Sequence, residues 1–545
     1  MQLTKLQQTA LILLVIIFVY LFFSFSLYRW IIDDAGITFA YSQSLAHGFG
    51  IVAQAGSPPV EGYSNFLWMI FQVPFIFLNI FDPVVTPKII AGVLFIGLLV
   101  LLLSLFDKKP FGQRIVIFTG LWIAMNPSLL IWFNSGLENS LYGLLFVSLI
   151  VTVYKKRDVV TPTSMILFGL IVSLLALTRP DGVIYAIIPP IFLVTHSFLL
   201  KKPTGILPVL RKLTWYVISI AIFYGGYVLF RMVYFHDVLP NTYHVKGGPS
   251  FDAVISLISL DEYVISKAIV FLTYMFGRVE ILIAAIFIMS VFFVYMLFRK
   301  RYFPIVIVEL LFFGLSFVTF LLMPDDWMPQ FRFATPAIIS GYLLFFTTLY
   351  YSREILAYYN KRAKKIVTVF AILISIAAMK SFSETLSVFA KSPTAPFSYV
   401  SRIYGHKFNA YADSLGVTNG SIVTPDVGGV LYYSNLRVID LAGLTDKRIA
   451  QSFNSNPADV MNYIFDEVKP TFIHTHGWFA YVLRFDEDER FTSNYVLVDV
   501  FEDRYIAENF SLTVYTGEFV RKDVVKDIPN YQQLWKDLQY YDTAY

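Results

Sequence analysis

Long apolar runs recur along the chain up to about residue 380, and they constrain the fold more than any other feature. Each run is close to or above the length that a helix needs to cross the hydrocarbon core of a bilayer. Because lipid offers no partners for backbone N–H and C=O groups, such runs are predicted to be transmembrane helices. Eleven spans are predicted, at residues 11–28, 88–105, 115–132, 140–154, 163–177, 183–200, 213–230, 281–298, 305–322, 334–350 and 366–379.

Two shorter apolar runs, at residues 66–81 and 265–276, leave eleven or thirteen spans as alternatives. If neither run crosses, all the basic loops fall on the side of the N-terminus; if both cross, four of the five change sides. The positive-inside rule therefore favours eleven spans, a cytoplasmic N-terminus and an external C-terminus. The five basic loops lie at residues 108–114, 155–157, 201–212, 299–301 and 353–365.

The composition agrees with a membrane protein and excludes several classes of function. Hydrophobic residues make up 57% of the 545 residues and charged residues only 15%, whereas soluble proteins carry about a quarter. The net charge of +4 is small and its basic residues lie in loops, so it indicates topology rather than nucleic-acid binding. There is no cysteine, which excludes disulfides, thiolate nucleophiles and cysteine-ligated metals.

The last 160 or so residues have the composition of a soluble domain. Short β-rich runs alternate there with helix-like segments such as 457–468, which predicts a mixed α/β domain outside the membrane. The predicted fold class is therefore an α-helical multi-span membrane protein, with a membrane domain at 1–384, a large external loop at 30–87, and an extracytoplasmic α/β domain at 385–545. The predicted strands are 421–425, 437–441, 471–474, 495–500 and 511–516.

In this topology, polar and aromatic residues from six external loops converge on one face of the membrane. Such convergence is typical of an active site. The candidate catalytic residues are Asp33 and Asp34. The candidate residues for binding donor or acceptor are His47, Glu61, Tyr63, Asn65, Glu138, Arg179, Asn241, Tyr243, Lys246, Asp326, Trp327 and Arg332.

Asp33 and Asp34 lie just beyond the first predicted span. Adjacent carboxylates repel, which raises the pKa of one of them, and a carboxylate within reach of a hydroxyl can act as a general base. The alternative is that Asp34 caps a helix predicted at residues 37–45. His47, near one face of that helix, is either a phosphate contact or a structural histidine.

The other candidates also have structural alternatives. Tyr63 and Asn65 offer hydrogen bonds to a sugar, or the segment caps a helix; Glu138 at the start of a span is favoured by the helix dipole in any case. The external cations Arg332, Arg179, Arg231 and Lys246 suit a phosphate. For Arg332 the alternative is a salt bridge to Asp325 or Asp326.

A divalent ion is a further hypothesis. Asp33, Asp34, Asp325 and Asp326, with His47 or Glu138, have the ligand types for one. No spacing among them is diagnostic, so no metal or other cofactor is predicted. Signals for Ser-His-Asp catalysis, nucleotide-binding loops and dinucleotide folds are absent from the sequence.

Several segments resemble a known family. DDAGITFAYSQSLAHGFG followed by VEGYSNFLW is similar to the first external loop of GT-C superfamily glycosyltransferases, in the branch of the terminal arabinofuranosyltransferases of mycobacterial cell walls. SGLE, LTRPDG, FHDVLPNTYHVK, DDWMPQFRF and YYSNLRVIDLAGLTD resemble the same branch, so the resemblance covers nearly the whole chain.

The resemblance implies an enzyme of the bacterial inner membrane that moves one sugar, with inversion, from a polyprenyl-phosphate donor to a cell-envelope glycan or lipid-linked acceptor. It implies Asp33 as the general base, with Asp34 beside it. The soluble domain would help to hold the acceptor, and its most suggestive polar residues are Asp426, Tyr432, Asp440 and Asp446.

Three other functions compete with this one. The chain could transfer another lipid-linked group, such as a phosphoglycerol or a whole oligosaccharide. It could be a transporter or flippase of envelope precursors, although such proteins carry polar residues within their spans and inverted repeats. It could also be a non-catalytic scaffold, which the paired acids at 33 and 34 argue against.

Overall fold

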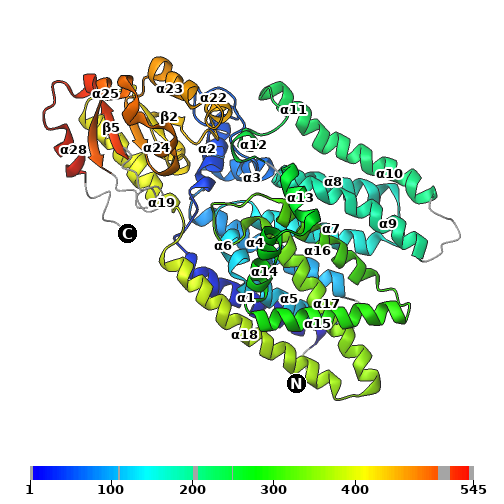
Figure 1. The fold of residues 1–545 in the computed structure, drawn as a ribbon. Helices are drawn as coiled ribbons and strands as arrows, with labels where there is room; N and C mark the ends of the chain where they lie inside the picture. The colour runs from blue at the N-terminus through cyan, green and yellow to red at the C-terminus, as the bar shows by residue number, and fades with distance from the viewer. Residues whose placement is uncertain (1–3, 108–110, 200–206, 248–249, 501–515, 539–545) are drawn as a thin grey trace. The chain divides into compact units, whose positions relative to one another are not determined.

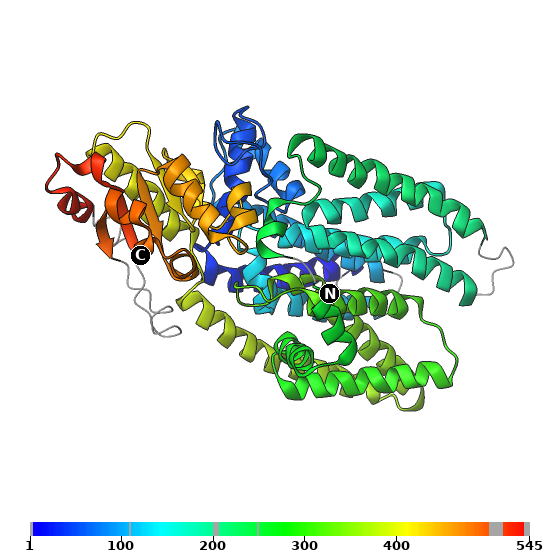
Figure 2. The ribbon, with the colours of Figure 1, turned by 45° about the horizontal axis from the view of Figure 1, so that its top comes forward.

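The computed structural model describes residues 4–107, 111–199, 207–247, 250–500 and 516–538, which are mainly helical with one small sheet near the C-terminus (Figures 1 and 2). The chain forms two compact units, described separately below. Unit 1 comprises Met1–Arg29, Val84–Tyr227 and Gly248–Thr394. Unit 2 comprises Trp30–Pro83, Val228–Gly247 and Ala395–Tyr545. The domain boundary at residue 384 stays a prediction.

Unit 1 consists of helices (Figure 1). They are α1 (Lys5–Ser24), η1 (Phe25–Leu27), α4 (Val85–Phe106), α5 (Gly112–Met125), α6 (Pro127–Phe133), α7 (Asn139–Lys156), α8 (Pro162–Thr178), η2 (Pro180–Ile187), α9 (Ile188–Leu199), α10 (Leu207–Ile220), η3 (Ala221–Gly225), α13 (Phe251–Ser259), α14 (Glu262–Phe276), α15 (Val279–Phe298), α16 (Pro304–Leu322), η4 (Arg332–Ala334), α17 (Thr335–Tyr359) and α18 (Ala363–Lys391). Helix α11 (Gly226–Tyr234) begins in unit 1 and continues into unit 2.

The predicted multi-span helical fold is confirmed, with fewer long spans than the eleven predicted. Eight helices in the described residues are long and apolar enough to cross a membrane, and a bent pair makes a ninth. The predicted spans at 140–154 and 163–177 are the helices α7 and α8; α8 has 17 residues, and α7 ends in Lys155 and Lys156. The eight are Gln7–Leu27, Val85–Phe106, Pro180–Phe198, Leu210–Tyr234, Val279–Phe298, Pro304–Leu322, Arg332–Tyr359 and Ala363–Lys391.

The bent pair is α5 and α6, which meet at 67°. Pro127 opens α6, and the residue before a proline is driven out of the helical region, so α5 ends at Met125. Asn126 has extended dihedral angles and its side chain accepts a hydrogen bond from the Leu129 N–H at 3.1 Å. The break is therefore capped rather than frayed.

The two short apolar runs form helices that are too short to span a bilayer. Helix α3 (Phe66–Phe77) has 12 residues and α14 has 15, about 18 and 22 Å at 1.5 Å per residue, against a hydrocarbon core of about 30 Å. These lengths agree with the expectation that neither run crosses. The side of the membrane on which each terminus lies stays a prediction.

Unit 2 holds the sheet that is visible near the C-terminus in Figure 2. The sheet has five strands in the order β2-β1-β3-β5-β4. Strands β1 (Ser421–Thr424), β2 (Arg437–Asp440) and β3 (Phe472–Thr475) are parallel, whereas β5 (Gly517–Arg521) is antiparallel to β3 and to β4 (Tyr495–Val500). Four of the predicted strands are confirmed. Residues 511–515 of the fifth lie outside the described residues, and β5 was not predicted.

The helices of unit 2 are mostly short. They are α2 (Asp34–Ala46), α3, α12 (Asn241–Lys246), α19 (Phe397–Val400), η5 (Ser401–His406), α20 (Lys407–Ser414), α21 (Gly428–Tyr433), α22 (Lys447–Ser452), α23 (Pro457–Asn462), η6 (Tyr463–Val468), α24 (Gly477–Leu483), η7 (Phe485–Glu487), α25 (Glu489–Asn494), α27 (Lys522–Val525) and α28 (Tyr531–Asp537).

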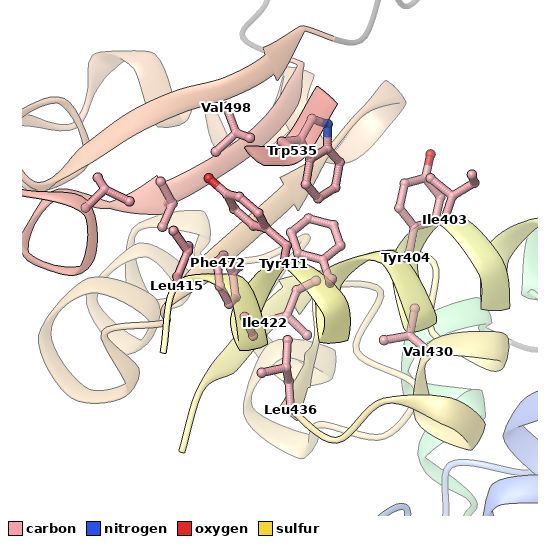
Figure 3. Close-up of a cluster of buried hydrophobic side chains, with 14 of the residues drawn as sticks. Ile403, Tyr404, Tyr411, Leu415, Ile422, Val430, Leu436, Phe472, Val498 and Trp535 are labelled. Atoms are coloured by element: carbon pink, nitrogen blue, oxygen red, sulfur yellow. The ribbon is translucent and has the colours of Figure 1, made fainter. Parts of the chain in front are cut away.

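The sheet is buried on both faces because its strands are apolar at consecutive positions. Ile422 of β1 and Phe472 of β3 belong to one core cluster, and their neighbours Val423 and Ile473 belong to another. Since successive side chains of a strand point to opposite faces, the two clusters cover the two faces. Figure 3 shows the first cluster, in which Tyr411 of α20 and Trp535 of α28 pack with Phe472.

Candidate active site

Backbone hydrogen bonds hold the segment around Asp33 in place. Its N–H donates to the Ala395 carbonyl at 2.9 Å, and the Phe397 N–H donates to the Ile31 carbonyl at 2.8 Å. These bonds fix the segment that follows η1 against residues near 396, all within unit 2. Asp33 is 6% exposed.

The carboxylate of Asp33 accepts two hydrogen bonds from backbone amides at the start of α21. Gly428 N–H donates to Oδ2 at 2.9 Å and Gly429 N–H donates to Oδ1 at 2.7 Å. The two residues are almost 400 positions away from Asp33 in the sequence. Because each carboxylate oxygen has a second lone pair, Asp33 can still accept a further proton or hydrogen bond.

Glycine is required where these segments meet. A Cβ on Gly428 would lie 1.8 Å from the Asp33 carbonyl oxygen, and one on Gly36 would lie 2.4 Å from the carbonyl carbon of Gly428. Real Cβ atoms do not approach backbone this closely. The first turn of α2 and the start of α21 can therefore meet only because residues 36 and 428 are glycines. The contact places the amides around Asp33.

Burial, together with the negative charges of Asp426 and Asp34, raises the pKa of the Asp33 carboxyl well above its usual range, although the two amides act in the opposite direction. One acid of the adjacent pair was predicted to have a raised pKa because the two carboxylates repel; for Asp33 the largest cause of the raised pKa is burial, and the charge of Asp34 adds to it. A carboxylate with a raised pKa is a stronger base, which suits proton abstraction near neutral pH.

Asp34 has a different environment from Asp33. It begins α2, but the cap position belongs to Asp33, whose side chain makes no capping bond to α2. The alternative that Asp34 caps this helix is therefore wrong, because the helix begins at Asp34, three residues before the predicted start at residue 37. The Asp34 carboxylate lies 3.3 Å from the Lys246 ammonium, and both side chains are partly exposed, at 20% and 36%.

Glu61 forms a buried salt bridge with Arg231. The guanidinium donates to both carboxylate oxygens, at 2.5 and 3.2 Å, and both side chains are almost fully buried. A fork-to-fork pair of this kind is strong and directional. It ties the segment between α2 and α3 to the end of α11, so Glu61 and Arg231 hold the site together rather than presenting charge to a ligand.

Three further candidates of unit 2 are engaged with protein groups. The Asn241 amide donates to the carbonyls of Gly443 and Leu444 at 2.7 and 2.9 Å. Asn65 is buried and accepts from the Thr38 hydroxyl at 3.1 Å. Tyr63 is 3% exposed and packs edge-to-face on another tyrosine ring, whereas Tyr243 is 43% exposed. Of these residues, Tyr243 is the one that is open to a ligand.

His47 lines a cavity of about 600 Å³ in unit 2. Its walls come from α2, from the loop after it, from residues 418–420, and from the segment that runs from the end of α21 to the start of β2. Tyr432, Asn435 and Arg437 line the same cavity, so two residues proposed from sequence, His47 and Tyr432, are brought together. The lining is rich in hydrogen-bonding groups, which suits a polyhydroxylated ligand.

In unit 1, Arg179 is buried between acidic residues. Its guanidinium lies 3.0 Å from the Asp181 carboxylate and 3.5 Å from that of Glu138. Glu138 occupies the cap position of α7 but makes no side-chain capping bond there, so its carboxylate faces Arg179 instead. The guanidinium also lies over the Phe333 ring, 4.7 Å from its centroid.

Arg332 lies against the same ring, 4.6 Å from its centroid. Its salt bridge to Asp326, at 2.9 Å, confirms one of the partners proposed from the sequence; Asp325 pairs with Lys267 instead. Both members of the Arg332–Asp326 pair are buried, with about a tenth of each side chain exposed. Trp327, beside this pair in sequence, is 57% exposed.

Asp440 and Asp446 of unit 2 have structural roles. Asp440 accepts hydrogen bonds from the N–H and the hydroxyl of Thr445, and its burial raises the pKa of its carboxyl to about 7. Asp446 caps α22 by accepting from the N–H groups of Arg448 and Ile449. The turn at the end of β2 therefore accounts for Asp440, and the helix cap accounts for Asp446.

One group of metal-ligand type occurs in the described residues, and sequence analysis missed most of it. Asp426, His474 and His476 have ligand atoms within 4.8 Å of one another. Burial lowers the pKa of His474, but its hydrogen bonds to Asp426 and Glu518 raise it to about 9. The sequence signal was a His-Thr-His segment at the end of a predicted strand. The acids first considered for a metal belong partly to unit 2, as Asp33 does, and partly to unit 1, as Asp326 does.

Comparisons with known proteins identify the fold. Residues 406–519 match a domain family described as a domain of unknown function, DUF8728. No curated protein sequence matches the chain. Solved structures do. The crystal structures of ArnT from Cupriavidus metallidurans, in the apo state and bound to undecaprenyl phosphate, each match with 12% identity and a TM-score of 0.53. The match covers 85–86% of this chain and 92–93% of theirs.

The archaeal oligosaccharyltransferase AglB from Archaeoglobus fulgidus, in complex with an inhibitory peptide and a dolichol-phosphate, matches with 13% identity and a TM-score of 0.51. The match covers 86% of this chain and 69% of AglB. The chain shares the fold of these structures. Membership of the GT-C superfamily, and of its arabinofuranosyltransferase branch, stays a prediction.

Proposed function

We propose that the chain is a membrane glycosyltransferase that transfers a single sugar, with inversion, from a polyprenyl-phosphate donor to a cell-envelope glycan or lipid-linked acceptor at the extracytoplasmic face. Two similar structures hold lipid phosphates, undecaprenyl phosphate in ArnT and dolichol-phosphate in AglB, which supports this donor class. The observation that carries the proposal is Asp33, a buried carboxylate just beyond the first long apolar helix, oriented by two backbone amides.

In the proposed reaction, an acceptor hydroxyl oxygen attacks the anomeric carbon from the face opposite the phosphate. The bond from that carbon to the phosphate oxygen breaks, and its electron pair leaves with the polyprenyl phosphate. Asp33 takes the hydroxyl proton. Because phosphate is a good leaving group, a base, positioning and charge stabilisation are the contributions that the protein has to make.

Lys246 is the proposed contact for the donor phosphate. Its ammonium lies next to Asp34 and its side chain is 36% exposed, so it can exchange one partner for another at little cost. Arg179 and Arg332 are less suited to this role in the described state. Each is buried and already paired with a carboxylate, which a phosphate would have to replace.

The cavity beside His47 is the proposed acceptor site. Tyr432, Asn435 and Arg437 supply hydroxyl, amide and guanidinium groups to its wall, and a glycan presents many hydroxyls to such groups. Removing a side chain that contacts the acceptor raises the acceptor KM more than it lowers kcat. We therefore expect that pattern for His47→Ala.

The test uses full-length protein in lipid nanodiscs, radiolabelled polyprenyl-phosphate pentoses and hexoses, and cell-envelope glycans. Wild type is compared with Asp33→Asn and with Asp413→Asn, a control that removes an exposed acid of unit 2. Transfer by wild type should fall about 10²- to 10⁴-fold in Asp33→Asn, the usual contribution of a general base. Asp413→Asn should match wild type.

A loss of transfer is assigned to the base only if Asp33→Asn still binds the donor and keeps the melting temperature of wild type. If it does not, Asp33→Glu keeps the carboxylate and tests the base by its pH profile. Wild-type rates should fall as the pH drops through the raised pKa of Asp33, because only the ionised carboxylate accepts a proton. Equal transfer by wild type and Asp33→Asn removes Asp33 from the mechanism. Donor-independent passage of a labelled lipid across the membrane, without transfer, favours a flippase instead.

A further inference from the structure

We propose that Asp426, His474 and His476 form a binding site for one zinc-type divalent transition-metal ion in unit 2. The three ligands differ from the proposed base, donor contact and acceptor residues, although Asp426 lies near enough to Asp33 to act on it electrostatically. Metal binding at these residues does not depend on the proposed function. Three side chains supply the ligands, a fourth orients one of them, and the sheet places them together.

The three ligand atoms already converge. Asp426 Oδ2 lies 3.3 Å from His474 Nε2 and 2.6 Å from His476 Nε2. Two ligands bound about 2.1 Å from one tetrahedral ion are about 3.4 Å apart, so the first distance already fits. The second is the length of a hydrogen bond, and it lengthens when a metal ion replaces the shared proton.

The second nitrogen of His474 has the partner that metal-binding histidines usually have. Its Nδ1 lies 3.2 Å from Oε1 of Glu518, which is the residue directly opposite His474 in the β3–β5 ladder. A carboxylate at this nitrogen fixes the tautomer in which Nε2 is free to bind a metal. The ring is fixed further by Tyr404, which stacks on it with centroids 3.9 Å apart.

The position in the sheet independently indicates a ligand. Asp426 follows the carboxyl end of β1, and His474 and His476 lie at the carboxyl end of β3, its parallel neighbour. Strand β1 lies between β2 and β3 in the sheet. The chain runs from β1 to β2 on one side of β1 and then crosses to form β3 on the other side. Ligands of open α/β sheets bind at this type of switch point, outside the carboxyl ends of the strands.

The types of the three ligand atoms indicate which metal ion binds. Two imidazoles and one carboxylate suit zinc and neighbouring transition metals, whereas magnesium and calcium prefer oxygen ligands. His474 is fully buried, but Asp426 and His476 are 27% and 29% exposed, so an ion can enter from their side. Three protein ligands leave one tetrahedral position for water or for a ligand oxygen.

The test measures metal content and affinity on the full chain in detergent, purified without a polyhistidine tag and stripped with a chelator. We expect one equivalent of Zn²⁺ per chain after desalting, a rise in melting temperature with Zn²⁺ but not with Mg²⁺, and visible ligand-field bands when Co²⁺ is bound. Asp426→Asn and His476→Ala should each weaken Zn²⁺ binding at least about 10-fold. His406→Ala, an exposed histidine of unit 2, is the control and should bind as wild type does.

Glu518→Gln separates a positioning role from a merely structural one. It keeps a hydrogen-bond acceptor for His474 but removes the charge, so it should weaken Zn²⁺ binding about 10-fold and shift the Co²⁺ bands while one equivalent still binds at saturation. The proposal is overturned if the stripped wild type takes up no Zn²⁺, or if uptake is unchanged in both His476→Ala and Asp426→Asn. In either case the cluster is a proton-bound group of ion pairs. Because no sugar donor is present, failure here leaves the transferase assay unaffected.

Discussion

Asp33 of unit 2 is held in a different way from the buried carboxylates of Asp326 and Glu138 in unit 1, and from Glu61 of its own unit, which pairs with Arg231. In unit 1, Asp326 and Glu138 face the guanidinium groups of Arg332 and Arg179, so charge is paired with charge. In unit 2, the Asp33 carboxylate accepts hydrogen bonds from two neutral amides. Its burial and the nearby negative charges both raise its pKa. The first arrangement makes a fixed ion pair that is costly to break. The second orients a carboxylate without neutralising it, which leaves Asp33 able to take up a proton.

The largest expected effect comes from breaking the pairing in unit 1. Arg332→Ala leaves the Asp326 carboxylate buried without its partner, which should cost about 3–5 kcal/mol of stability. Thermal unfolding of the full chain in detergent measures the change. Replacing both residues by apolar ones, Arg332→Met with Asp326→Leu, should restore most of the loss, because the uncompensated charge is removed as well.

The control for this prediction is Arg278→Ala. Arg278 also pairs with an acid, Glu280 at 3.4 Å, but the two side chains are 50% and 68% exposed. Exposed pairs are worth at most about 1 kcal/mol, so this variant should unfold close to wild type. An equal loss in both arginine variants would show that the burial of the Arg332 pair does not matter.

A smaller effect is expected where unit 2 holds Asp33. In Gly428→Ala the new Cβ would lie 1.8 Å from the Asp33 carbonyl oxygen, so α21 must move away. Overpacking of this kind costs about 1–3 kcal/mol. Because the same movement removes the amides from the Asp33 carboxylate, transfer activity should fall further than stability does.

Gly405→Ala is the matched control, since its Cβ would meet its nearest neighbour, the Gly429 carbonyl oxygen, at an ordinary 3.4 Å. Melting temperature and transfer rate are measured on both variants. If Gly428→Ala keeps the stability and activity of wild type, the close approach of α21 does not position Asp33.

The pH dependence of stability sharpens the comparison, because Asp440, like Asp33, is buried with neutral hydrogen-bond donors and has another acid, Asp446, nearby. The pKa of its carboxyl is raised to about 7 in the folded state, from 3.8. Its contribution to stability is therefore complete below about pH 4 and is lost as the pH rises to about 7. In that range the contribution falls by about 1.4 kcal/mol for each pH unit.

Asp440→Asn should remove this slope, so that the variant gains stability relative to wild type as the pH rises. Asn keeps an oxygen for the Thr445 N–H and hydroxyl, which limits other losses. Unfolding is followed across this pH range for wild type, Asp440→Asn and the exposed-site variant Asp413→Asn. If the slope persists in Asp440→Asn, other titratable groups cause it.

The sequence predicted what local patterns determine. The apolar runs became helices, and four predicted strands are present because their residues alternate between two buried faces. The Arg332–Asp326 pair was foreseen because the residues are close in sequence. Strand β5 was missed because Gly517–Arg521 carries charges at both ends, and one of them, Glu518, points inward to His474.

The contacts that build the candidate sites could not be predicted, because they depend on register and on distant segments. Nothing near Asp33 in the sequence indicates that Gly428 and Gly429 supply its hydrogen bonds. Likewise, Asp426 and His474 meet because β1 and β3 are parallel neighbours, which a strand prediction does not include.

The smallest effect on stability is expected at Lys246. Its pair with Asp34, at 3.3 Å, is partly exposed, so Lys246→Met should change the free energy of unfolding by less than about 1 kcal/mol. If Lys246 contacts the donor phosphate, the same change should raise the donor KM about 10-fold, because an interaction with a charged group is worth roughly 1.5 kcal/mol or more. Steady-state transfer rates against donor concentration measure it.

Lys447→Met is a close match for this change. Lys447 lies 3.1 Å from Asp237, with side-chain exposures of 38% and 24% against 36% and 20% for Lys246 and Asp34. The two variants should therefore lose equally little stability, and a difference in donor KM between them reports the phosphate rather than the salt bridge. A donor KM raised equally by both, or by neither, would move the phosphate contact away from Lys246 and back to the arginines of unit 1, where binding must first displace a buried carboxylate.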